Sequence, residues 1–162
     1  EGVVDKNCLR KRRKLPASIF WEHGVLRPFC RLFYSEENFY HSINNKLDFN
    51  RISVLSGACF FVDLQWFFSV GFFDSNTFLY EEEHILFEKI KKSNKKVLLS
   101  NRSSIIHLGS KSTNSNNFDV TKKYYFESLK YYLTNYRMVN SFYASLLIYY
   151  ISISDKILKL FR

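Results

Sequence analysis

The chain has 162 residues, enough for about one domain, and its 17 Phe and 11 Tyr exclude a disordered protein. Apolar residues make up 46% and charged residues 24%, as in globular proteins. The 24 Lys and Arg against 15 Asp and Glu leave a formal net charge of +9. This charge favours anionic partners, such as nucleic acid, phosphorylated ligands or an acidic membrane surface, without choosing among them.

The three cysteines, Cys8, Cys30 and Cys59, are an odd number at wide spacing, which fits neither a disulfide framework nor a zinc motif. A reducing compartment is the simplest interpretation. Residues 1–14 are charged and polar, so no secretory signal is recognised there. The first residue is Glu1, and we expect a further N-terminal portion to precede it.

The N-terminal third gives few structural signals. Residues 11–14 form a basic run that we interpret as solvated surface, with nucleic-acid binding or a localisation signal as the alternative. Residues 15–50 mix aromatic and charged side chains without a clean period. We expect a connecting region there with one or two short helices.

The pattern sharpens from residue 51 onward. Residues 52–62 are apolar and β-rich, and they predict a strand or a bent strand pair in which Gly57 permits the bend. Residues 63–70 predict a short helix and residues 71–76 a loop. We expect four phenylalanines of this region to supply a core, namely Phe60, Phe61, Phe72 and Phe73.

Residues 80–92 predict an amphipathic helix with Leu86 and Ile90, four apart, on its inward face. Glutamates at 81–83 fill its first turn and lysines at 91–92 its last, the distribution that the helix dipole favours. Residues 97–99 and 104–106 are short strand candidates, and a polar loop follows from His107 to Thr113.

Residues 114–121 are rich in Asn and Ser and predict a linker, and the pattern from 122 to 162 is helical. The apolar stretch at 142–153 is too short and too interrupted by serines for a membrane span, which needs about 20 residues. Basic residues close the tail, so we predict a helix that lies on a membrane surface. We place two regions, 1–118 and a helical tail at 119–162.

Several landmarks follow one another between Val54 and Thr113. They are Ser-Gly-Ala at 56–58, Gly-Phe-Phe-Asp at 71–74, Phe-Leu-Tyr at 78–80, an acidic stretch at 81–83 and a histidine at 107. This order resembles the second half of the rhamnosyltransferase-like branch of family 2 glycosyltransferases. The resemblance covers about residues 1–135 and is strong over 54–113. It implies an α/β fold, a partial GT-A (Rossmann-like) sandwich with a C-terminal helical tail.

The family's first half holds the nucleotide-sugar donor and an Asp-x-Asp metal motif, and neither is found here. The chain therefore resembles the acceptor-side half of such an enzyme. The resemblance implies a nucleotide-sugar donor, a saccharide or lipid-linked acceptor, and a peripheral position at the cytoplasmic face of the inner membrane.

The resemblance also implies which residues carry the chemistry. In the family the second residue of an acidic pair is the base that deprotonates the acceptor hydroxyl, and this position falls on Glu83, with Glu82 before it. Glutamate replaces the usual aspartate, so the side chain is one methylene longer. Three glutamates in the first turn of a helix could instead serve only to complement its dipole.

The other implied positions surround the donor and acceptor. His107 matches a histidine near the diphosphate and its Mg²⁺ or Mn²⁺ ion, and the alternative is a structural histidine. Small residues at the donor sugar and further contacts to donor or acceptor fall on Ser56, Gly57, Ala58, Asp74 and Lys89.

Two other function classes compete with sugar transfer. A non-catalytic remnant, or a module that binds acceptor or membrane, would explain the missing donor half. A nucleic-acid binder would explain the basic and aromatic composition. No recognised RNA-binding signature is present, so we expect no nucleic-acid partner.

Overall fold

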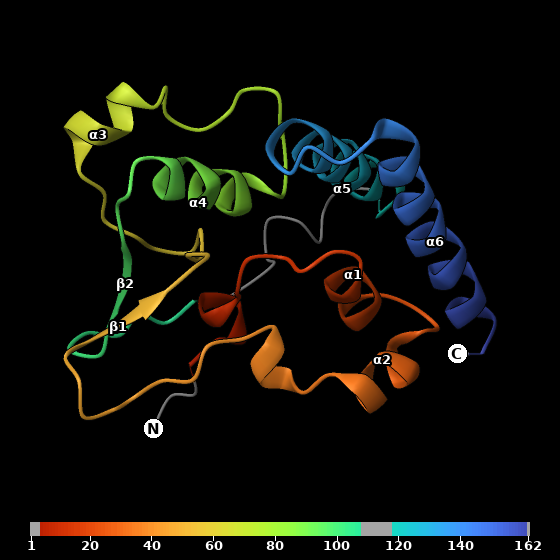
Figure 1. The fold of residues 1–162 in the computed structure, drawn as a ribbon, viewed down its shortest axis with the longest axis horizontal. Helices are drawn as coiled ribbons and strands as arrows, with labels where there is room; N and C mark the ends of the chain where they lie inside the picture. The colour runs from red at the N-terminus through yellow and green to blue at the C-terminus, as the bar shows by residue number, and fades with distance from the viewer. Residues whose placement is uncertain (1–3, 108–117, 162) are drawn as a thin grey trace.

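The computed structural model describes residues 4–107 and 118–161. This part of the chain is mixed α/β, with helices at one end and a small sheet at the other (Figure 1). Helix α4 lies between the two ends. The N-terminal helical elements are η1 (Lys6–Leu9), α1 (Ala17–Glu22), α2 (Arg27–Phe33) and η2 (Glu36–Asn38). The elements that follow are β1 (Phe49–Ile52), α3 (Leu64–Ser69), α4 (Glu82–Lys92), β2 (Val97–Ser100), α5 (Phe118–Tyr131), the π-helical η3 (Tyr132–Tyr136) and α6 (Ser141–Leu160).

Strands β1 and β2 form a two-stranded antiparallel sheet, with Phe49 opposite Ser100 and Ile52 opposite Val97. The predicted strand at 97–99 is confirmed, whereas the prediction over 52–62 is wrong beyond Ile52. Ser56, Gly57 and their neighbours turn the chain instead, and Phe61 is 99% exposed. Local β propensity does not make a strand where the described residues offer no second strand to pair with.

The predicted strand at 104–106 is also wrong. The chain leaves the sheet at Asn101, whose amide donates to the carbonyl oxygens of Leu47 at 2.7 Å and Asn44 at 3.1 Å. Ile105 and Ile106 are then exposed. Their apolar, β-branched side chains favoured a strand that the backbone does not form.

The short helices were predicted well. Asp63 caps α3 by accepting a hydrogen bond from the backbone of Trp66 at 3.1 Å, as an N-cap carboxylate does. In α4, Leu86 and Ile90 are buried as expected, and they pack with Leu55 and Trp66. The expected one or two short helices in residues 15–50 are present as α1 and α2.

The four phenylalanines expected in the core lie mostly outside it. Phe60 is partly buried, but Phe61, Phe72 and Phe73 are exposed. Phe60 and Phe73 meet edge to face, with ring centroids 6.1 Å apart. Phe60 also packs against the cluster of Leu55 and Trp66, so it is the one of the four that contributes to a core.

The largest cluster of buried apolar residues joins the tail to the rest of the chain. Leu129, Tyr132, Leu147 and Ile151 pack there with Ile19 of α1 and Ile85 of α4. The tail is helical as predicted, and it shares its core with earlier elements. Of the expected linker at 114–121, residues 118–121 begin α5 and the rest lie outside the described residues.

None of the helices in the described ranges combines the length and the apolar character needed to cross a membrane. Helix α6 is long enough at 20 residues, and Asn140 caps its start by accepting from the backbone of Phe142 at 2.8 Å. Its apolar stretch is interrupted by polar residues such as Ser145 and Ser152.

Candidate functional site

Two residues with left-handed backbone precede helix α4. Tyr80 has φ 69° and Glu81 has φ 64°, a conformation that costs about 1–2 kcal/mol for residues other than glycine. This turn separates the three glutamates. Glu81 points into the protein and is 3% exposed, whereas Glu82 and Glu83 begin the helix and are partly exposed.

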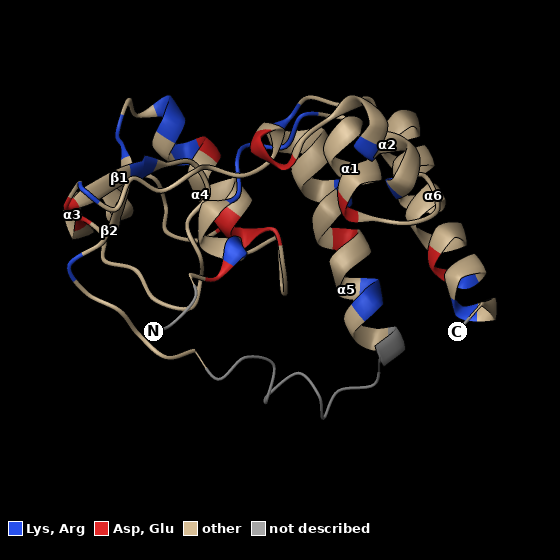
Figure 2. Ribbon diagram, turned by 90° about the horizontal axis from the view of Figure 1, so that it is seen from below, with Lys and Arg blue, Asp and Glu red and all other residues tan. Residues whose placement is uncertain are grey.

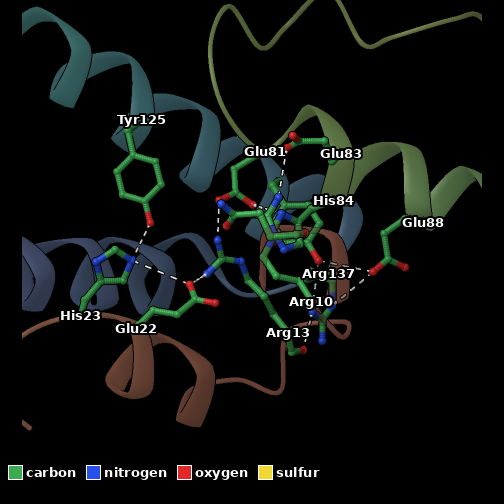
Figure 3. A network of polar contacts seen from close by, with 12 residues as sticks. Arg10, Arg13, Glu22, His23, Glu81, Glu83, His84, Glu88, Tyr125 and Arg137 are labelled. Atoms are coloured by element: carbon green, nitrogen blue, oxygen red, sulfur yellow. Dashed lines mark hydrogen bonds and ion pairs between the residues drawn. The ribbon is translucent and has the colours of Figure 1, made fainter. Parts of the chain in front are cut away.

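The carboxylate of Glu83 is held by two groups from distant parts of the chain. The backbone N–H of Gly57 donates to Oε1 at 3.0 Å, and Nη2 of Arg10 lies 3.6 Å from Oε2 (Figure 3). The side chain remains 17% exposed. Glu83 is therefore oriented and near the surface, with lone pairs that can accept a proton from a bound hydroxyl.

The predicted small-residue loop is the partner of Glu83. Gly57 and Ala58 are exposed, and the hydroxyl of Ser56 accepts from the backbone of Ala58 at 3.3 Å. A Cβ added to Gly57 would lie 2.9 Å from Oε1 of Glu83. Glycine at 57 is thus needed for the close approach of this loop to the carboxylate.

Gly57→Ala is expected to lower a Glu83-dependent turnover roughly tenfold to a hundredfold, because the new methyl group pushes the carboxylate out of position. The free energy of unfolding should change by less than about 1 kcal/mol, since the site is exposed. Steady-state rates and urea unfolding of the same preparations measure both. Unchanged turnover would mean that the position of Glu83 has no bearing on activity.

Glu82 occupies the neighbouring position at the start of α4 and is half-buried. Burial raises the pKa of its carboxyl, and the nearby charge of Glu83 raises it further.

Beneath the start of α4 lies a buried ion-pair network that the sequence did not reveal (Figure 3). Arg13, 5% exposed, contacts Glu22 at 2.5 Å and Glu81 at 2.8 Å. Burial opposes its charge, but these two carboxylates raise the pKa of Arg13 well above the ordinary value. The interpretation of residues 11–14 as solvated surface is therefore wrong for Arg13.

His84 lies in the same network. Its Nδ1 is 3.3 Å from Oε2 of Glu81, but neither ring nitrogen has hydrogen-bond geometry to a partner. Burial lowers the pKa of His84 well below the ordinary value, and Arg13 and Arg10 lower it further, so the ring is neutral at pH 7. The pair is thus a close polar contact rather than a salt bridge. Burial also raises the pKa of Glu81, against the effect of Arg13.

A second layer connects the network to the tail. Glu88 accepts two hydrogen bonds from Arg12, at 2.6 and 2.8 Å. Arg137 donates to the backbone oxygen of Arg13 at 2.7 Å, and its Nε lies 3.9 Å from Glu88. The middle of α4 is thereby fixed to the segment before α1 and to Arg137 after η3.

Asp74 and Lys89, expected at the donor or acceptor, have their polar atoms engaged within the protein. The ammonium of Lys89 donates to the backbone oxygens of Val70 at 3.0 Å and Phe72 at 2.7 Å. The carboxylate of Asp74 accepts from the hydroxyls of Tyr131 at 3.0 Å and Tyr136 at 2.5 Å. Lys89 therefore joins the loop at 70–74 to α4, and Asp74 joins the same loop to the tail.

Partial burial opposes ionisation of Asp74, but hydrogen bonds from Tyr136, Asn76 and Tyr131 outweigh it and lower its pKa to about 2. The folded-state pKa lies below the unfolded value, so this stabilisation is present above about pH 4 and is lost as the pH falls toward 2. Asp74→Asn is expected to remove roughly 1–2 kcal/mol at pH 7 and little at pH 2. Urea unfolding at both values tests this, and equal losses at both would contradict it.

His107 is exposed and is the last described residue before the gap at 108–117. Within residues 4–107 and 118–161, no three His, Cys, Asp or Glu side chains converge to hold a metal ion. A single imidazole does not fit Mg²⁺, which takes oxygen ligands in octahedral geometry. The Mg²⁺ or Mn²⁺ site predicted at His107 therefore stays a prediction.

The structure thus brings Gly57 and Glu83 together and leaves Asp74 and Lys89 in supporting contacts. Sequence reasoning missed Arg10, Arg13 and His84. One signal was present: Glu81, His84 and Glu88 recur at the spacing of one helix face, the face that also carries buried Ile85. Buried glutamates require partners, and Arg13 and Arg12 supply them to Glu81 and Glu88.

Comparison with known proteins adds no relative: no family model matches the chain, and no curated protein or solved structure matches it either.

Proposed function

We propose that this chain is the acceptor-side half of a family 2 glycosyltransferase, with Glu83 as the base. The observation that carries the proposal is the 3.0 Å hydrogen bond from Gly57 to Glu83. The two residues are 26 positions apart in the sequence. The family resemblance assigns Gly57 to the loop beside the donor sugar and Glu83 to the base. A fold that placed them apart would have removed the basis for the proposal.

In the proposed reaction the acceptor hydroxyl gives its proton to a carboxylate oxygen of Glu83. The hydroxyl oxygen forms a bond to the anomeric carbon of the donor, and the bond from that carbon to the nucleoside diphosphate breaks on the opposite face. The configuration at the anomeric carbon is inverted. Arg10 and the N–H of Gly57 support this role, because they hold the carboxylate in one position.

The partners of the proposed enzyme follow from the same resemblance. They are a nucleotide-sugar donor and a saccharide or lipid-linked acceptor, in the synthesis of a cell-surface polysaccharide. A lipid-linked acceptor would place the enzyme at the cytoplasmic face of the inner membrane. When bound, Mg²⁺ or Mn²⁺ would neutralise the negative charge of the diphosphate.

A transfer assay tests the proposal. The purified chain is incubated with Mn²⁺, a panel of radiolabelled UDP-, GDP- and dTDP-sugars, and a bacterial lipid extract as acceptor. We expect label to enter the lipid fraction with one donor. Absence of transfer across the panel, together with absence of both nucleotide-sugar and lipid-acceptor binding by calorimetry, would reject the proposal.

One observation favours the alternative of a binding module without catalysis. Two hollows in the described surface are lined by residues of the N-terminal region, and Glu83 lines neither of them. The first is lined by Lys6, Trp21, Arg27, Arg31, Glu36 and Tyr40. The calorimetric measurement separates the two candidates, because tight nucleotide-sugar binding by the chain alone would reject the module.

A further inference from the structure

Helix α2 exposes almost all of its side chains. Cys30 is its one buried residue, whereas Phe29 is 66%, Leu32 76% and Phe33 75% exposed. These three residues have the i, i+3, i+4 spacing of one helix face. Large apolar side chains gathered on one exposed face indicate a surface that binds a partner.

A second apolar stripe runs along α6. Its exposed members are spaced four, three, four and seven residues apart, so they lie on one face: Phe142, Leu146, Tyr149, Ile153 and Leu160. Their exposed fractions range from 37% at Ile153 to 84% at Leu160.

The turn that leads into α2 packs on α6. The backbone at Gly24, between α1 and α2, lies so close to Ser154 of α6 that an added Cβ would be 2.3 Å from the serine Cβ. The hydroxyl of Tyr150 accepts from the backbone N–H of Leu26 and donates to the carbonyl of His23, both at 3.1 Å. The turn between α1 and α2 therefore lies against α6.

The charges on these two helices are mainly positive. Helix α2 carries Arg27 and Arg31 and no acidic residue, and both arginines line the first hollow, where Lys6 is paired with Glu36. Helix α6 carries Lys156 and Lys159 near its end (Figure 2), and its one acidic residue, Asp155, is paired with a lysine of α5 at 2.8 Å. Apolar side chains with flanking cations complement an anionic lipid surface. The apolar side chains enter the acyl region, and the cations contact the phosphates.

We infer that α2 and α6 form one surface that binds an anionic phospholipid bilayer. The tail was expected to touch lipid from its sequence, and the structure adds α2 with its two arginines and places it beside the tail. The inference does not depend on sugar transfer, because a bilayer can be bound without donor or acceptor.

The test measures sedimentation of the full chain with sucrose-loaded vesicles, either phosphatidylglycerol and phosphatidylcholine at 1:1 or pure phosphatidylcholine. We expect binding to the anionic vesicles that weakens with added salt. Phe29→Ser/Leu32→Ser should lower this affinity at least about tenfold, since two side chains no longer enter the bilayer. Arg27→Gln/Arg31→Gln should lower it about tenfold on anionic vesicles and leave binding to phosphatidylcholine unchanged.

A matched control removes a phenylalanine and a leucine from another exposed site. Phe61 is 99% and Leu64 64% exposed, and they lie at α3, at the other end of the molecule (Figure 1). Phe61→Ser/Leu64→Ser should bind vesicles like the wild type.

Three results would overturn the inference: no vesicle binding by the wild type, equal loss in the α3 control, or a wild-type dimer that the α2 variant converts to a monomer. The last would mean that a second copy of the chain covers the surface. Circular dichroism of each variant confirms folding, and neither substituted residue of α2 belongs to a buried cluster.

Discussion

Arg13→Met is expected to lower the free energy of unfolding by about 3–5 kcal/mol, because it leaves buried carboxylates without their cation. Arg13 contacts both Glu22 and Glu81, and Glu81 is 3% exposed. Methionine keeps much of the volume, so the loss reports the charge rather than a cavity. Such a loss is a large part of the stability of a domain of this size. Urea unfolding at pH 7 measures it.

Two further variants make this result specific. Arg102→Met removes an exposed ion pair with Asp48 and should cost less than about 1 kcal/mol. Arg13→Met/Glu81→Gln should recover part of the loss, because the double variant buries one unpaired carboxylate fewer. A loss below 1 kcal/mol for Arg13→Met alone would show that the network does not stabilise the fold.

Glu83→Gln is expected to lower sugar transfer about 10²–10⁴-fold, the usual contribution of a general base. The amide oxygen can still accept the hydrogen bond from Gly57, so the loop at 56–58 should keep its place. The amide cannot take a proton from the acceptor hydroxyl. Initial rates at saturating donor and acceptor measure the effect, and the unfolding midpoint should stay close to that of the wild type.

Glu127→Gln is the matched control for Glu83→Gln, because Glu127 is an exposed glutamate of α5 paired with Lys123 at 3.9 Å. It should leave transfer unchanged. Equal rates for Glu83→Gln and the wild type would remove Glu83 from the proposed chemistry while leaving the description of the fold intact.

Elements with a complete local signal could be predicted from the sequence. Helix α4 has its apolar residues four apart and its lysines at the end, and α3 begins after a capping aspartate. Residues 52–62 show the limit of this reasoning, since a strand requires a partner that the local sequence does not contain. The described residues combine helices with a two-stranded antiparallel sheet and are therefore mixed α/β, and the partial GT-A sandwich remains a proposal.

Contacts between distant charges could not be predicted. Arg13 and Glu81 are 68 residues apart, and a basic run on a polar segment has the same pattern whether it is solvated or buried. The family motifs assign Gly57 to the donor sugar and Glu83 to the base, but the hydrogen bond between them was not predicted. Asp74 and Lys89 match that order too, yet their polar groups bind the protein itself.

Azide provides the sharpest test of Glu83, because this anion attacks carbon without first losing a proton. Glu83→Ala is incubated with sodium azide and a nucleotide-sugar that the wild type uses. We expect a glycosyl azide of inverted configuration, formed faster than the variant glycosylates its own acceptor. A folded variant that binds the donor but yields no glycosyl azide would contradict a base at this position.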